Sequence, residues 1–106
     1  MPKGYIIARM TVSDPDAYME YAKRARIAMA KYGARILVLA GAHEALQGEA
    51  RERNVILEFD SFDRAKEYYS SPEYREAKAF RTAAGVSEGE ILAVEGYDGP
   101  QPGDAH

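Results

Sequence analysis

The amino-acid sequence predicts a single α+β domain, in which two helical regions pack against one antiparallel sheet of four strands. Three observations support this fold class. The chain has 106 residues with 46% hydrophobic content, which suits one hydrophobic core and is too short for two domains. Four short segments are rich in apolar residues, either alternating or in short runs, as in strands, and apolar residues recur at helical spacing in two longer segments. These segments follow the order strand, helix, strand, strand, helix, strand, which is the split βαβ arrangement.

The first strand is predicted to begin near Gly4. Its even-numbered residues from Ile6 to Val12 are all apolar and fall on one face. Its odd-numbered residues from Tyr5 to Thr11 are mixed and fall on the other face. We therefore expect the first face to meet the helices and the second to be partly covered.

A helix is predicted to follow directly. Asp14 can serve as its N-cap, and Pro15 suits the first helical position, where no backbone donor is needed. Gly33 suits its end, because glycine readily adopts a left-handed conformation. An apolar stripe runs along the segment at helical spacing: Tyr18, Tyr21, Ala22, Ala25, Ala28, Met29 and Tyr32.

Two strands and a hairpin are predicted next. Residues 35–40 form an almost continuous apolar run, which is typical of a well-buried strand. Gly41 suggests a bulge or bend, with the strand continuing as far as Leu46 in one interpretation. The polar residues 47–53 are expected to form the hairpin loop, and the alternating residues 55–59 the third strand.

The second helical region is predicted to be broken in two. Ser61 can cap its start, and Asp63 in the first turn suits the positive end of the helix dipole. Pro72 must interrupt the helix, because proline has no backbone donor, and Ser71 can cap the restart.

The sequence divides into a folded domain over residues 1–97 and a tail over residues 98–106. A turn at residues 85–89 is expected to precede the last strand, residues 91–94. Glycine, proline and polar residues dominate from Asp98 onward, which predicts a disordered tail.

One face of the predicted sheet is bare. Right-handed crossovers place both helical regions on the same side, which makes the fold ferredoxin-like, βαββαβ. In the predicted register the bare face carries Tyr5, Ile7, Leu37, Leu39 and Ile56. An apolar surface of this kind usually marks an interface, so we expect a homodimer that packs sheet to sheet.

Composition narrows the range of partners. The formal net charge of −3 gives no general attraction to nucleic acid or to an anionic membrane, and neither is expected as a partner. The chain contains no cysteine, which excludes disulfides and thiolate chemistry. No apolar segment approaches the roughly 20 residues of a membrane span, and a cytoplasmic location is expected.

Several short motifs, in order and spacing, resemble the family catalogued as domain of unknown function 1330. They are Gly4-Tyr5, Asp14-Pro15-Asp16-Ala17-Tyr18, Tyr32-Gly33-Ala34-Arg35, Glu58-Phe59-Asp60-Ser61-Phe62, Ser71-Pro72-Glu73-Tyr74 and Arg81. The resemblance implies a dimeric α/β barrel, in which two sheets face each other with helices outside. Families of similar fold include cofactor-free monooxygenases, haem-degrading enzymes, muconolactone isomerases and ligand-sensing domains.

Two residues are candidates for catalysis. His43 could act as a general base or ligate haem iron, or could simply be a polar residue near a strand end. Glu58 interrupts an apolar strand, and Arg81 is its candidate partner. Such a pair could hold a ligand carboxylate or could fix how helix meets sheet. No metal site and no cofactor are expected.

Arg81, Tyr74, Tyr18 and Tyr5 are candidates for binding a ligand. Tyrosine buries a large ring while its hydroxyl needs a partner, so a tyrosine cluster suits a small aromatic or enolic ligand. The same residues could equally form the rim of the core. The polar residues at apolar positions favour a small enzyme without metal or organic cofactor, monooxygenase- or isomerase-like, that acts on a small apolar or carboxylated substrate. Two alternatives stay open: a non-catalytic binding or sensing module, and a structural dimer with a filled core.

Overall fold

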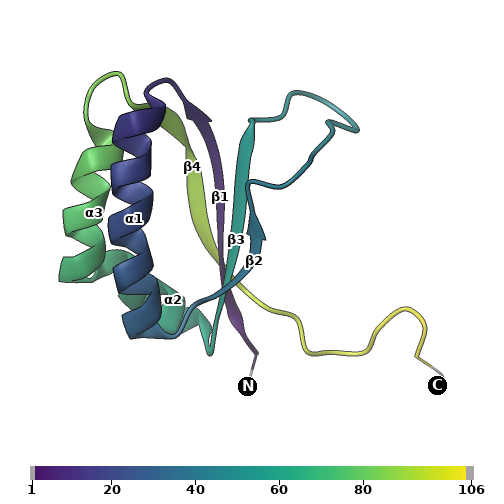
Figure 1. Ribbon diagram of the computed structural model, residues 1–106. Helices are drawn as coiled ribbons and strands as arrows, with labels where there is room; N and C mark the ends of the chain where they lie inside the picture. The colour runs from purple at the N-terminus through teal and green to yellow at the C-terminus, as the bar shows by residue number, and fades with distance from the viewer. Residues whose placement is uncertain (1, 105–106) are drawn as a thin grey trace.

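The computed structural model describes residues 2–104 and has the predicted order of elements (Figure 1). These are β1 (Gly4–Val12), α1 (Pro15–Tyr32), β2 (Arg35–Leu39), β3 (Arg53–Phe59), α2 (Phe62–Ser70), α3 (Pro72–Thr82) and β4 (Ser87–Glu95). The strands form one antiparallel sheet in the order β2-β3-β1-β4. All three helices cover the same face of the sheet (Figure 1). The predicted ferredoxin-like fold is confirmed.

Both ends of α1 form as the local sequence predicts. The Asp14 carboxylate accepts a hydrogen bond from the Ala17 backbone N–H at 3.2 Å, and Pro15 occupies the first turn. Gly33 ends the helix with a φ of 74°. This left-handed conformation favours glycine, because a Cβ would crowd the backbone there.

The break between α2 and α3 is also confirmed. The Ser71 hydroxyl donates to the Tyr68 carbonyl at 2.7 Å and accepts from the Tyr74 backbone N–H at 3.1 Å. Ser71 is therefore the C-cap of α2 and the N-cap of α3, with Pro72 starting the new helix. The bend brings Tyr68 of α2 and Tyr74 of α3 together, with ring centroids 4.9 Å apart.

A bulge in β2 corrects the predicted strand phase. The pairing with β3 shifts between Ile36 and Val38, so that Val38 lies opposite Ile56 and Leu39 lies opposite Val55. A bulge inserts one extra residue and moves the following side chains to the other face. Leu39 therefore faces the helices rather than the bare face, where the simple alternation had placed it.

The loop between β2 and β3 is longer than predicted. β2 ends at Leu39, and Ala40 has a φ of 49°, which turns the chain out of the sheet. The far end of the loop is fixed by Arg51, whose guanidinium donates to Glu90 at 2.8 and 3.0 Å and to the Thr11 hydroxyl at 2.8 Å. This contact ties the end of the loop to β1 and β4, and β3 starts at residue 53 rather than 55, with Arg53 opposite Met10.

The core lies between the sheet and the helices. Its largest fully buried side chains are Met10 from β1, Phe59 from β3, Tyr68 from α2 and Tyr74 from α3. Tyrosine rings therefore take the central places that leucine or phenylalanine occupies in many small domains. Each buried hydroxyl then needs a hydrogen-bond partner within the core.

The opposite face of the sheet is open, as predicted. Tyr5 and Ile7 are half-buried there, whereas Leu92 and Val94 are 48% and 39% exposed. Residues 98–104 form no helix or strand and extend away from the domain (Figure 1). Residues 105–106 of the predicted tail lie outside the described part, and the disorder of the tail stays a prediction. Within residues 2–104, no helix is long and apolar enough to cross a bilayer.

Candidate functional site

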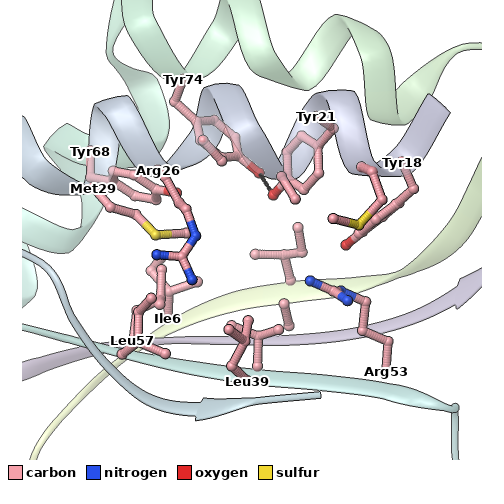
Figure 2. A pocket seen from close by; sticks show the side chains of 17 residues that line it. Ile6, Tyr18, Tyr21, Arg26, Met29, Leu39, Arg53, Leu57, Tyr68 and Tyr74 are labelled. Carbon is pink, nitrogen blue, oxygen red and sulfur yellow. Dashed lines mark hydrogen bonds between the residues drawn. The ribbon is translucent and has the colours of Figure 1, made fainter. Parts of the chain in front are cut away.

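A cavity of about 220 Å³ lies between α1 and the sheet, and we call it the inner cavity (Figure 2). Most of its wall is apolar. Helix α1 contributes Ala22, Ala25 and Met29, and the sheet contributes Ile6, Leu39 and Leu57. The bulge in β2 is what turns Leu39 into this wall. The position of the cavity, between helices and sheet, suits a small ligand with a large apolar surface.

Hydroxyl groups line the helix side of the inner cavity. The hydroxyls of Tyr21 and Tyr74 lie 2.8 Å apart, joined by one hydrogen bond (Figure 2). Tyr18 and Tyr68 complete this side of the wall. Burial raises the pKa of all four tyrosines, so each hydroxyl stays protonated near neutral pH. These groups are therefore hydrogen-bond donors and poor general bases.

Arg53 brings a positive charge to the wall from the sheet. Its guanidinium carbon lies 5.0 Å from the centroid of the Tyr18 ring, and its Nε is buried without a hydrogen-bond partner among residues 2–104. Figure 2 shows this side chain rising from β3 toward Tyr18, on the side of the cavity opposite Arg26. Arg53, Tyr18 and Met19 also line a second hollow of about 430 Å³, which we call the outer groove.

Arg81 lies behind the tyrosines rather than in the wall. It is only 8% exposed, and its Nη2 donates to the Tyr69 hydroxyl at 3.2 Å. Its guanidinium carbon is 5.4 Å from the Tyr21 ring centroid. Among the residues that the structure describes, Arg81 has no carboxylate within ion-pair distance. It is a buried cation, surrounded by aromatic rings and hydroxyls.

The expected pairing of Glu58 with Arg81 is wrong. In β3 the odd-numbered residues Val55, Leu57 and Phe59 face the helices, so Glu58 faces the open side of the sheet. Arg81 is on the helix side, with the sheet between the two groups. Glu58 instead accepts a hydrogen bond from the Tyr5 hydroxyl at 3.1 Å, which raises the pKa of Tyr5.

His43 is exposed in the loop between β2 and β3. Its Nδ1 lies 3.2 Å from the carbonyl oxygen of Gly41, and the residue lines neither the inner cavity nor the outer groove. Of the predicted site residues, Tyr18 and Tyr74 meet at the inner cavity. His43, Glu58 and Tyr5 lie elsewhere, and their predicted roles stay predictions. No cluster of three His, Asp or Glu side chains over residues 2–104 is placed to hold a metal ion.

A comparison with known protein families identifies the family of this chain. The profile of the family described as Domain of unknown function (DUF1330) matches residues 3–97. The chain belongs to this family. No curated protein matches this DUF1330 protein.

Solved structures share the fold of this DUF1330 protein at low sequence identity. A protein of unknown function from Rhodopseudomonas palustris is 21% identical, with a TM-score of 0.65 over 92% of this chain and 84% of that one. SnoaB, a cofactor-independent oxygenase from Streptomyces nogalater, is 12% identical, with a TM-score of 0.58 over 98% and 100%. A conserved protein from Methanosarcina mazei Go1 is 14% identical, with a TM-score of 0.54 over 92% and 95%. At these identities the similarity establishes the fold alone.

The sequence prediction for this DUF1330 protein missed Arg53 and Tyr21 as site residues. Arg53 had been assigned to the hairpin loop, although it stands two positions before Val55 and continues the alternation that faces the helices. A charge on an apolar strand face is the signal that could have identified it. Tyr21 had been recognised only as part of the stripe along α1.

Proposed function

We propose that this DUF1330 protein binds a small, largely apolar molecule in the inner cavity. The observation that carries the proposal is the cavity itself, which has a volume of about 220 Å³ and an apolar wall. A structural dimer with a filled core would have no such cavity between the helices and the sheet. An engineered apolar cavity of about 150 Å³ is large enough for benzene, so a compound of one or two rings is a suitable occupant.

The wall supports binding more directly than proton transfer. Of the residues that the structure describes, those in the wall include no carboxylate and no histidine. Because burial raises the pKa of the lining tyrosines, none of them is suited to take a proton from a substrate at neutral pH. The polar groups of the wall instead fix the orientation of a bound molecule.

An enzyme without metal or organic cofactor, oxygenase- or isomerase-like, is the second candidate. Arg53 supports it, because a guanidinium beside the cavity stabilises negative charge that develops on an enol or phenol. SnoaB, which shares the fold, is a cofactor-independent oxygenase. Oxygen uptake with a dihydroxynaphthalene distinguishes the candidates, since a purely binding protein leaves the compound unchanged.

Filling the cavity tests the binding proposal. Ala22 lines the inner cavity, and Ala22→Leu adds three carbons to that space. We expect the affinity for 2-naphthol, followed by NMR titration, to fall at least tenfold, while thermal stability is unchanged or higher. The matched control is Ala30→Leu, on the exposed side of the same helix, which should bind like the wild type. Equal binding by both variants would place the ligand elsewhere.

We also propose that two copies pack through the open sheet face. The centre of this face is apolar, and Arg9 lies toward one end, next to Glu90, whose carboxylate already pairs with Arg51. The other end carries Arg35 opposite Glu58. A two-fold axis brings the same surface of both copies together. The apolar centres can then pack against each other, and the charges of one copy can pair with opposite charges of the other.

Leu92→Lys is the variant that tests this interface. Leu92 is 48% exposed on the open face, so a lysine is harmless in a monomer but costly when two sheets meet. We expect sedimentation equilibrium to give a dimer for the wild type and a monomer for the variant. Ile27→Lys is the control, because Ile27 is 66% exposed on α1, away from that face. A dimer that survives Leu92→Lys would assign the interface to another surface.

A further inference from the structure

We infer that the molecule bound in the inner cavity is an organic anion, whose acidic oxygens sit against Arg53 and Tyr18. This inference rests on the proposed function and adds the chemical class of the ligand. The predicted ligand has a flat apolar ring system, which lies among the alanines of α1. It also has one carboxylate, phenolate or enolate group, which lies at the Arg53 end of the cavity.

The first observation is the incomplete environment of Arg53. Its Nε is buried without a hydrogen-bond partner, and no ion pair in the described part of the chain includes it. A guanidinium has five N–H donors and no acceptor, and a partly buried one normally meets a carboxylate. Here the ring of Tyr18 covers one side, at 5.0 Å from the guanidinium carbon, and the cavity lies on another.

The second observation is the balance of donors and acceptors in the wall. Tyr21 and Tyr74 share one hydrogen bond, so one of the two O–H groups still has a proton to donate. With the hydroxyl of Tyr18 and the guanidinium of Arg53, the wall offers several donors and no carboxylate. Behind it, Arg81 adds a second buried positive charge without an acidic partner. A ligand with anionic oxygens satisfies these donors, whereas a hydrocarbon leaves them unpaired.

The third observation is the route into the cavity. Tyr18, Met19 and Arg53 line both the outer groove and the inner cavity, so they stand where the two hollows meet. The acid of the outer groove, Glu52, accepts the Val12 backbone N–H at 2.9 Å instead of pairing with Arg53. A ligand that enters through the groove can pass its ring beyond the flexible Met19 side chain and leave its charged group beside Arg53.

The test compares a neutral and an anionic probe of the same ring size, 2-naphthol and 2-naphthoate, by NMR titration at neutral pH. A charge-assisted hydrogen bond in a partly buried site corresponds to an affinity gain of roughly ten- to a hundredfold. We expect the wild type to prefer 2-naphthoate by this factor. Arg53→Met should lose the preference while its affinity for 2-naphthol changes by less than about threefold.

The matched control is Arg26→Met, which removes the same charge from the opposite, exposed side of the cavity. It should keep most of the preference for 2-naphthoate. If Arg53→Met does not fold, the NMR titration of the wild type still tests the inference. The Arg53 Nε–H resonance should shift with 2-naphthoate and much less with 2-naphthol.

The outcomes separate this inference from the proposed function. If 2-naphthol binds and 2-naphthoate binds no better, the anion inference is overturned and the apolar cavity stands. If the preference persists in Arg53→Met and disappears in Arg26→Met, the anion is held at the other end and the inference is again overturned. If neither probe binds, the binding function itself fails.

Discussion

Gly4→Ala is expected to lower the free energy of unfolding by about 3 kcal/mol, at the upper end of the usual cost of overpacking. A Cβ built on Gly4 would lie 2.3 Å from the Ser61 carbonyl oxygen and 2.5 Å from the Phe62 backbone nitrogen. Both atoms belong to the backbone at the start of α2, so no side-chain rotation relieves the clash. The first residue of β1 thus sets how closely α2 approaches the sheet.

Urea denaturation followed by circular dichroism measures this effect. Gly41→Ala is the matched control, because a Cβ at Gly41 has open space around it and the backbone there is not left-handed. That variant should unfold at nearly the wild-type midpoint. Equal midpoints for the two variants would mean that α2 can move away from β1 without cost.

Tyr74→Ala is expected to cost about 3–5 kcal/mol, the range for removing a large buried ring. The Tyr74 ring is 1% exposed, and its centroid lies 4.7 Å from that of Tyr69 and 4.9 Å from that of Tyr68. Tyr74→Phe keeps the ring and removes only the hydroxyl that meets Tyr21, so about 1 kcal/mol is expected.

The two Tyr74 variants separate packing from hydrogen bonding. Denaturation midpoints give the stability difference, and near-ultraviolet circular dichroism shows whether the tyrosine cluster stays ordered. If Tyr74→Phe destabilised the protein as much as Tyr74→Ala, the hydroxyl pair would be the main contribution of this residue. Tyr74 would then chiefly stabilise the fold rather than supply a hydroxyl to a molecule in the inner cavity.

The elements of this fold could be predicted where the deciding contacts are local. Asp14 and Pro15 at the start of α1, Gly33 at its end, and Ser71 with Pro72 between α2 and α3 all act within a few residues. Capping and proline effects depend on the adjacent backbone, so the neighbouring residues in the sequence are enough to predict where these helices begin and end. The placement of both helical regions on one face of the sheet then followed from handedness rules that hold for nearly all such crossovers.

The features that the sequence did not predict depend on partners distant in the chain. The bulge in β2 exists only in the register with β3, so alternation within β2 could not place Leu39. Arg53 belongs to β3 because it pairs with Met10 of β1, which is distant in the chain. Tyr18 and Tyr74 line the inner cavity whereas Arg81 lies behind it, and this difference depends on three-dimensional packing.

The shared cap at Ser71 makes the junction of α2 and α3 unusually sensitive to chain length. One serine serves two helices, so no spare residue absorbs an insertion. A single added residue would rotate α3 by about 100° and turn Tyr74 away from its neighbours. Residues 40–50, every one exposed, tolerate such changes with little effect. As relatives diverge, insertions and deletions should therefore gather in that loop, while the length of the chain between Tyr68 and Tyr74 stays fixed.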